Sequence, residues 1–336
     1  MRSPVLPADF YLRPTRRQYA LRRLMILTLA IALFTAAGGT VYGISRIGSS
    51  GRHAQAGTAG GPSHSTAKPA APLPPLSKEP GGGTTLFPSH RLVAYYGAPA
   101  SPTLGVLGDA PPDVLWSRLA AAAAPFAVPK TAVVASYELI AYTAEAAPGP
   151  NGTYSAELAP SQLDEYLNVV HAHHGMLILD IQPGRSDLLA DAQSLEPWLA
   201  HPDVGLALDP EWELQPGQRP SQQIGRTTAG EINQVSAWLQ QLTVAHRLPQ
   251  KLLIVHQFRA SMVEAKPDVT SRPNLALAFN MDGFGAAENK LSVYQLLAGD
   301  PRWALGYKLF YSRDQPLQTP DQILALAPAP QIVEYE

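Results

Sequence analysis

The segment Gly205-Leu206-Ala207-Leu208-Asp209-Pro210-Glu211 alternates leucines with small or acidic residues. Successive side chains of a β-strand point to opposite faces, so Leu206 and Leu208 are expected on one face and Asp209 and Glu211 on the other. In a parallel barrel every second side chain points into the interior, and active-site residues lie at the carboxyl ends of the strands. The segment therefore predicts a barrel strand that ends in two inward-facing acids.

Similar β-rich runs recur from residue 91 onward and alternate with amphipathic segments. The predicted strands are Arg91–Gly97, Ala132–Glu138, Met176–Gln182, Val204–Glu211, Lys251–Gln257, Leu275–Asp282, Trp303–Tyr311 and Gln331–Tyr335. The predicted helices span residues 112–124, 160–173, 187–201, 228–246, 259–265, 288–299 and 320–327. Thr228 and Glu231 form the pattern of a capping box at the start of one of them.

Eight strands alternating with helices favour an α/β fold of the (β/α)8 TIM-like type. The sequence ends directly after the eighth strand, so we expect the barrel to lack its last helix. A doubly wound open sheet is the alternative. No GxGxxG motif follows the first strand and no P-loop occurs, which weakens the nucleotide-binding versions of that alternative.

The N-terminal part contains an uncharged apolar run at residues 24–44, which reads LMILTLAIALFTAAGGTVYGI. As a helix it would extend roughly 30 Å, the thickness of the hydrocarbon core of a membrane. Several arginines precede it, namely Arg13, Arg16, Arg17, Arg22 and Arg23. The positive-inside rule then places the N-terminus in the cytoplasm and the remainder outside. A cleaved secretory signal, with Ala36-Ala37-Gly38 as its processing site, is the alternative and also implies export.

Composition divides the chain into four parts. We expect a basic cytoplasmic tail at residues 1–23, a transmembrane helix in the lipid bilayer at 24–44, a Pro/Gly/Ser-rich stalk at 45–89, and an extracytoplasmic barrel domain at 90–336. The protein is thus predicted to be a single-pass protein of the cell membrane.

Several function classes are excluded or weakened by the composition. The chain has no cysteine, which rules out disulfides, thiol nucleophiles and cysteine-ligated metals. Its net charge is −2 and its only basic cluster is N-terminal, so no nucleic-acid partner is expected. No GxSxG motif supports Ser-His-Asp catalysis. We predict no cofactor and no bound metal.

Polar residues fall late in nearly every predicted strand. Those expected at the carboxyl-terminal rim are Tyr96, Glu138, Asp180, Gln182, Asp209, Glu211, His256, Gln257, Asn280, Asp282 and Lys308. Burying this many ionisable groups is costly unless they are paired or functional. The pattern therefore predicts a pocket at this rim.

The pair Asp209 and Glu211, followed by Trp212, carries the most specific chemical signal. Adjacent carboxyls raise the pKa of one member, and an aromatic side chain can stack on a sugar ring. The Asp-x-Glu at the end of strand four resembles that of family-25 muramidases and, less closely, family-18 chitinases. The resemblance implies that Glu211 is the general acid, that Asp209 assists the substrate, and that polysaccharide or peptidoglycan is cleaved. Tyr95-Tyr96-Gly97 stands where the muramidases have an Asp at the end of strand one.

In the resemblance-based interpretation the remaining rim residues bind substrate. They are Tyr96, Glu138, Asp180, Gln182, Trp212, His256, Gln257, Asn280, Asp282 and Lys308. Two other interpretations stay open: a metal-dependent barrel hydrolase that uses Asp180, Asp209, Glu211 and His256, and a non-catalytic envelope protein that binds glycan or a partner. His171, His173 and His174 precede a strand and are interpreted as a solvated helix end.

Overall fold

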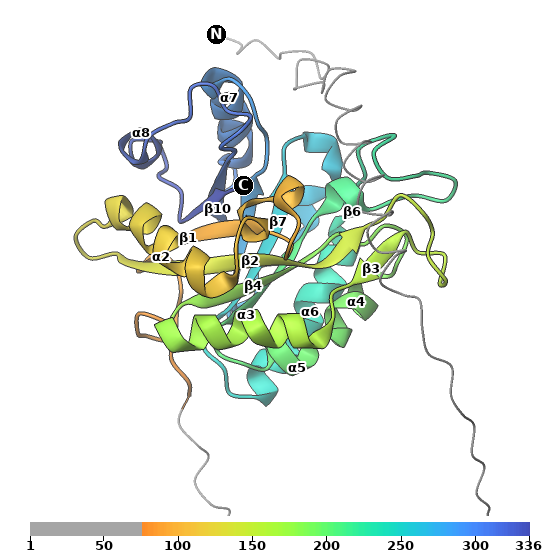
Figure 1. Ribbon diagram of the computed structural model, residues 1–336, viewed down its shortest axis with the longest axis horizontal. Coiled ribbons are helices and arrows are strands. Elements are labelled where there is room, and N and C mark those ends of the chain that lie inside the picture. The colour runs from red at the N-terminus through yellow and green to blue at the C-terminus, as the bar shows by residue number, and fades with distance from the viewer. Residues whose placement is uncertain (1–75) are drawn as a thin grey trace, which may run out of the picture.

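The structure, a computed structural model, describes residues 76–336 (Figure 1). Its main sheet contains eight parallel strands in the order β1-β2-β4-β5-β7-β9-β10-β11. Their bounds are β1 His90–Gly97, β2 Ala132–Ala144, β4 Met176–Ile181, β5 Val204–Leu208, β7 Lys251–Gln257, β9 Leu275–Met281, β10 Ala304–Leu309 and β11 Ile332–Tyr335. A short ninth strand, β3 (Ser155–Glu157), pairs antiparallel with the extended end of β2.

The sheet closes on itself because β11 pairs with both β10 and β1. Ile332 lies opposite Leu92 on one side and Gly306 on the other, and β1 also pairs with β2. The predicted (β/α)8 barrel is confirmed at this level, and the open sheet is excluded. Within residues 76–336 no helix follows β11, yet pairing on both edges of this strand is sufficient for closure.

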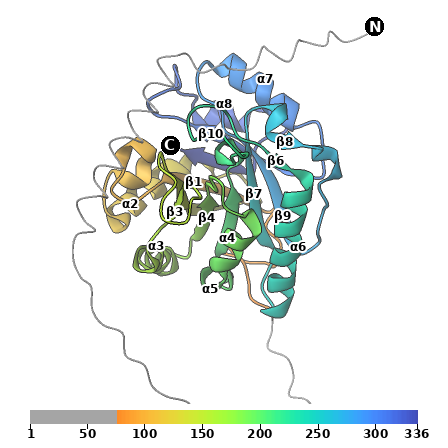
Figure 2. The ribbon, with the colours of Figure 1, turned by 90° about the vertical axis from the view of Figure 1, so that its right-hand side faces the viewer.

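Helices cover the outside of the strands (Figures 1 and 2). Their bounds are α2 Pro112–Ala123, α3 Pro160–His173, α4 Leu188–Ser194, α5 Glu196–Leu199, α6 Ala229–Ala245, α7 Ala287–Leu297 and α8 Pro320–Leu324. Helix α2 packs on β1 and β2, α3 on β2 and β4, and α6 on β7 and β9. Leu206 and Leu208 belong to this outer core, whereas Ala207 belongs to the core inside the barrel. The alternation expected for the fourth barrel strand is therefore present up to Leu208.

Four predicted elements differ from the structure, one of them being β2, which continues six residues beyond its predicted end at Glu138. The segment 259–265, predicted as a helix, forms a 3-10 turn at Ala260–Met262 and the short strand β8 at Val263–Glu264, which pairs with β6 (Thr227–Thr228). Seven residues are too few for a stable helix without strong packing, and strand pairing satisfies the backbone instead. The predicted helix 187–201 is divided into α4 and α5, with Pro197 in the first turn of α5.

The fourth barrel strand is also shorter than predicted. It ends at Leu208, and Pro210–Trp212 form a 3-10 turn. Proline cannot donate a ladder hydrogen bond, which accounts for the end of the strand. The expectation that Asp209 and Glu211 share one strand face is therefore wrong.

Residues 76–89, which the composition assigns to the stalk, pack against the amino-terminal end of the barrel. Leu86 is fully buried among residues of the barrel interior, and its backbone N–H donates to Gln250 Oε1 at 3.1 Å. Ser77 donates its backbone N–H to the carbonyl oxygen of Arg247 at 3.2 Å. This segment therefore closes the end of the barrel opposite the carboxyl ends of the strands.

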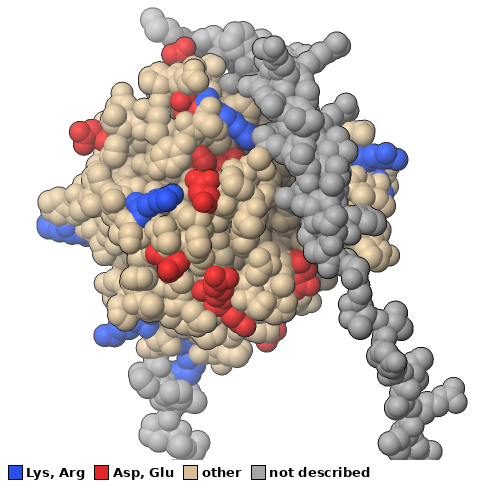
Figure 3. All heavy atoms as spheres, viewed as in Figure 1, with Lys and Arg blue, Asp and Glu red and all other residues tan. Residues whose placement is uncertain are grey.

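The predicted cytoplasmic tail, the transmembrane helix and residues 45–75 of the stalk lie outside the described residues. Among residues 76–336, no helix combines the length and apolar character that membrane crossing requires. On the face shown in Figure 3, lysines and arginines are scattered among aspartates and glutamates.

Candidate functional site

Each barrel strand contributes an inward polar side chain, which lies at or just after the carboxyl end of the strand except for Glu138, in the middle of the long strand β2. These residues are Tyr96, Glu138, Asp180, Asp209, His256, Asn280, Asp282, Lys308 and Glu334, and nearly all are buried. Below them the interior is apolar, with Leu92, Val134, Met176, Ile178, Ala207, Leu252, Ile254, Ala276, Ala278 and Ile332. The alternation of each strand produces both layers, because the side chains two positions earlier fill the barrel beneath the polar ring.

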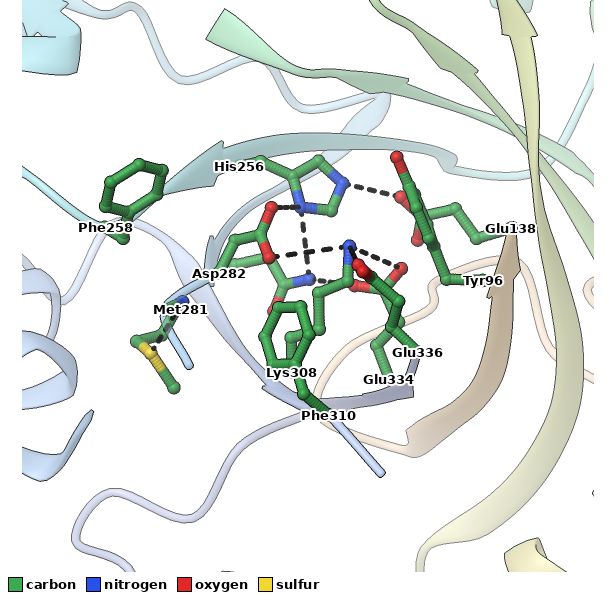
Figure 4. Close-up of polar contacts among 12 residues, drawn as sticks. Tyr96, Glu138, His256, Phe258, Met281, Asp282, Lys308, Phe310, Glu334 and Glu336 are labelled. Carbon is green, nitrogen blue, oxygen red and sulfur yellow. Dashed lines mark hydrogen bonds and ion pairs between the residues drawn. The ribbon is translucent and has the colours of Figure 1, made fainter. Parts of the chain in front are cut away.

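His256 lies between two carboxylates inside the barrel (Figure 4). Its Nε2 is 2.6 Å from Glu138 Oε1, and its Nδ1 is 3.4 Å from Asp282 Oδ2. Burial alone would lower the pKa of His256, but the charges of Glu138 and Asp282 outweigh burial and hold this pKa well above its ordinary value. The imidazole is therefore a cation fixed by hydrogen bonds on both sides.

Lys308 is the second buried cation. Its Nζ lies 3.1 Å from Glu336 Oε2, 3.5 Å from Asp282 Oδ1 and 3.3 Å from the centroid of the Tyr96 ring. Figure 4 shows this ammonium among Tyr96, Asp282, Glu334 and Glu336. Burial would lower the pKa of Lys308, but the surrounding carboxylates hold it well above its usual range. Lys308 is thus a charged partner for these acids and not a nucleophilic amine.

Asp180, Tyr96 and Gln182 form a hydrogen-bonded chain. The Tyr96 hydroxyl donates to Asp180 Oδ2 at 3.0 Å, and Gln182 Nε2 donates to the same hydroxyl at 3.0 Å. The side-chain oxygen of Gln182 accepts from the backbone N–H of Ala144. Burial raises the pKa of Asp180 to about 7, against the opposing effect of His256. Asp180 can therefore gain or lose a proton near neutral pH.

A pocket opens above this network, with a cavity volume of about 60 Å³. It is lined by Tyr96, Thr103, Leu104, Ile140, Gln182, Asp209, Glu211, Trp212, Asp282, Lys308, Phe310, Arg313 and Glu336. The volume holds a few water molecules or one substituent of a larger ligand, because pockets that enclose whole ligands are several times larger.

Asp209 and Glu211 both line this pocket, although they are not on one strand. Asp209 follows the end of β5 and is 3% exposed, and one of its oxygens has no hydrogen-bond partner. Burial, reinforced by Asp180 and Glu211, raises the pKa of Asp209 well above its ordinary value. Glu211 sits on the 3-10 turn after β5, and its carbonyl oxygen accepts from the backbone N–H of Gly225 at 2.7 Å.

Three other site residues were predicted from the sequence, and each of them lies in a different place relative to the pocket. Trp212 is half-buried and lines the pocket, and Asn280 lies in the interior, where its amide donates to Glu334. Gln257 points away from the ring, since it accepts from Lys266 Nζ at 2.8 Å and donates to the carbonyl oxygen of Arg259. Adjacent residues of a strand face opposite sides, so His256 and Gln257 could not both line the barrel interior.

Sequence reasoning missed several polar or aromatic groups of the site, among them Glu334, Phe310, Arg313 and Glu336. Glu334 lies late in β11 and faces inward, so its alternation with Val333 and Tyr335 was a usable signal. Phe310 and Glu336 follow their strands at the same inward parity. Arg313, whose Nη2 is 4.0 Å from Glu336 Oε1, lies in a loop that has no sequence pattern of its own.

Among residues 76–336, two groups of side chains are arranged so that they could hold a metal ion. Glu138, Asp180 and His256 place one ligand atom each within 4.8 Å of one another. This group shares Asp180 and His256 with the metal set considered from the sequence. This group lies beneath Tyr96 and Lys308 and does not line the pocket. A metal ion bound there would have to break the Glu138–His256 hydrogen bond. The second group, His171, His201 and Asp203, lies at the opposite end of the barrel.

Comparisons with known proteins give no family for this chain. No family model matches it, and no curated protein matches it either. Among solved structures it is similar to Burkholderia cenocepacia dihydropteroate synthase complexed with 7,8-dihydropteroate, with a TM-score of 0.35 and 11% identity over 74% of this chain and 86% of that one. At this level the similarity carries no argument about activity.

The resemblance to family-25 muramidases and family-18 chitinases is wrong. The comparisons identify neither family, because no family model and no curated protein matches the chain. The physical reason is that Asp209 and Glu211 are not a pair at the end of one strand. Asp209 ends a strand and Glu211 belongs to a separate 3-10 turn, so their spacing of two does not place them as neighbours on one strand face.

Proposed function

We propose that the barrel is a hydrolase that cleaves a neutral, polyhydroxylated chain such as a polysaccharide by general acid–base catalysis, outside the cytoplasm. The observation that carries the proposal is Asp209, a buried acid on the wall of an open pocket with Glu211 beside it. It depends on the pocket alone and not on a family resemblance.

The proton-transfer roles follow from the two environments. Burial raises the pKa of Asp209 well above its ordinary value, which favours the protonated form that can donate a proton to a leaving oxygen. Glu211, on the exposed side of Asp209, would accept a proton from the attacking water. The bond from water oxygen to the substrate forms as the bond to the leaving oxygen breaks, and one proton enters the leaving group while another reaches Glu211. The general acid is thus Asp209, whereas the resemblance implied Glu211 as the acid and Asp209 as the carboxylate that assists the substrate.

The charge of the pocket selects the substrate class. With Asp209 protonated, three acids of the pocket, Glu211, Asp282 and Glu336, face two basic residues. One of these, Lys308, is already engaged by Asp282 and Glu336. Anionic substrates would be repelled, whereas hydroxyl groups can donate hydrogen bonds to carboxylates.

The shape of the pocket agrees with a chain that lies across the rim. A cavity of about 60 Å³ cannot enclose a sugar ring, so only the reacting group would enter. Aromatic side chains of Trp212 and Phe310 line the same opening and offer faces for the apolar side of a ring.

The test uses the full-length protein with neutral polysaccharides and, for comparison, anionic polymers, and measures new reducing ends. We expect Asp209→Asn and Glu211→Gln each to lower kcat by roughly 10²–10⁴-fold while the melting temperature stays close to that of the wild-type protein. The control Glu288→Gln changes an exposed acid of α7 and should leave the rate unchanged.

Two results would overturn the proposal. Absence of cleavage of every polymer by the wild-type protein would favour a non-catalytic binding protein. Loss of folding stability in both variants without a separate loss of rate would assign Asp209 and Glu211 to a structural network.

A further inference from the structure

A second cavity, of about 470 Å³, lies at the amino-terminal end of the barrel, on the side opposite the pocket. Glu79, His171 and Asp203 line it. His171 is in the last turn of α3, and Asp203 directly precedes β5. Neither the proposed hydrolysis nor the upper polar network uses any of these residues.

Three side chains here have the arrangement of a metal site. One ligand atom each from His171, His201 and Asp203 lie within 4.8 Å of one another. His171 Nε2 is 3.1 Å from Asp203 Oδ2, and the imidazole rings of His171 and His201 have centroids 5.3 Å apart. Ligands around tetrahedral zinc are about 3.3 Å apart because each bond is about 2.0–2.1 Å long, so small side-chain rotations bring this set to bonding distance.

The backbone that carries His201 is held in place by a buried amine. Lys251 is 1% exposed, and its Nζ donates to the carbonyl oxygens of His201 at 2.5 Å and Val204 at 2.7 Å. The turn between α5 and β5 is therefore fixed before any ion binds. A site with pre-positioned ligands loses less conformational entropy on binding.

Glu79, which lines the same cavity, is a second and independent observation. Its side chain is 3% exposed, and neither carboxylate oxygen has a hydrogen-bond partner among the described residues. A buried carboxyl group whose oxygens accept no hydrogen bond from a donor is costly. A water molecule bound to a metal would supply that donor, because a metal ion makes its water a strong hydrogen-bond donor.

We propose that His171, His201 and Asp203 bind one Zn²⁺ ion, with a water molecule in the fourth position that donates a hydrogen bond to Glu79. Two imidazoles and one carboxylate form a ligand set that favours zinc over magnesium or calcium, which prefer all-oxygen sites. The bound ion would connect the segment containing Glu79 to α3 and to the start of β5.

The experiment titrates Zn²⁺ into full-length protein that has been stripped with EDTA, in competition with a chromophoric chelator. We expect one tight equivalent, a higher melting temperature with zinc, and, when Co²⁺ replaces zinc, the visible absorption of a tetrahedral ion. His201→Ala and Asp203→Asn should weaken zinc binding at least about 10-fold, and Glu79→Gln should weaken it by roughly 10-fold through the lost water contact.

The matched control is His246→Ala, which removes an exposed histidine at the end of α6 and should leave zinc affinity unchanged. Thermal melting in EDTA shows whether each variant folds. If His201→Ala does not fold, the near-isosteric Asp203→Asn variant provides the test of zinc binding. A wild-type protein without a tight equivalent would overturn the proposal. A tight equivalent that persists in both ligand variants would place the ion elsewhere and overturn it equally.

Discussion

Asp180 is fully buried beneath the pocket, and its carboxyl group accepts a hydrogen bond from the Tyr96 hydroxyl. Burial raises its pKa from 3.8 to about 7. Between these pH values the folded protein holds a proton that the unfolded chain has released, so the free energy of unfolding falls as pH rises. Glu79 and Glu213, whose pKa values burial raises to about 8, change stability in the same direction.

We therefore expect Asp180→Asn to flatten the decline in stability between pH 4 and pH 7. The amide oxygen can still accept from Tyr96. Near pH 7.5 the variant should be more stable than the wild-type protein by on the order of 4 kcal/mol, because each unit of the pKa shift from 3.8 to about 7 corresponds to about 1.4 kcal/mol. Urea denaturation across this pH range measures the effect. Asp113→Asn, at an exposed position in α2, is the control. A variant that is less stable than the wild-type protein at every pH would contradict this prediction.

Single residues of the site were predictable from the sequence where strand alternation holds. Tyr96, Glu138, Asp180, His256 and Lys308 occupy inward positions because each lies an even number of residues from an inward apolar side chain. Glu211 and Arg313 lie in turns beyond the strands, where alternation carries no information. The contacts between strands, such as Glu138 with His256, depend on barrel closure and register, which no local pattern encodes.

At the scale of elements, the loop after β5 determines where Glu211 points. Gly225 lies against the 3-10 turn at Pro210–Trp212 and donates its N–H to Glu211. A Cβ at residue 225 would lie 2.3 Å from the carbonyl oxygen of Glu213 and 2.7 Å from that of Glu211. These are backbone atoms of the site itself, so the loop cannot keep its position with a larger residue.

Gly225→Ala is expected to lower the free energy of unfolding by about 1–3 kcal/mol and to lower polysaccharide cleavage further than this loss explains, because Glu211 is displaced. Denaturant unfolding and kinetics on folded protein separate the two effects. Gly230→Ala in α6 is the matched control, since the nearest atom to its Cβ is 3.4 Å away and alanine favours the helix by about 1 kcal/mol. Equal behaviour of the two variants would show that the loop does not position Glu211.

The elements that the sequence predicted well are those with a long, regular pattern. All eight barrel strands are found, and helix α6, with its capping box at Thr228, lies within one residue of its predicted bounds. The ends of two strands differ more, since β2 continues to Ala144 and β5 stops at Leu208. Short segments such as 259–265 were not predictable, because the partner strand β6 is more than thirty residues away in the chain. Tertiary pairing decides the structure of such segments.

For the whole molecule, the export of the barrel domain is a proposal from the N-terminal sequence. A reporter enzyme fused after Glu336 should be active only outside the cytoplasm, and the mature protein should retain residues 1–45, because the apolar run at 24–44 follows a cluster of arginines. Protease added to intact cells should digest the barrel domain. Protection in intact cells combined with digestion after lysis would reverse the orientation.

The limits of the folded unit can be tested through the segment that closes the amino-terminal end of the barrel. Leu86 is fully buried against interior residues such as Leu252 and Ile332, so a fragment of residues 90–336 would expose this apolar surface. We expect residues 76–336 to unfold cooperatively and residues 90–336 to be less stable by at least about 3 kcal/mol, with Leu86→Ala alone costing about 2–5 kcal/mol. Leu76→Ala, at an exposed leucine, should cost little. Equal denaturation midpoints for the two fragments would mean that the barrel is complete without residues 76–89 and that composition alone had located the start of the domain correctly.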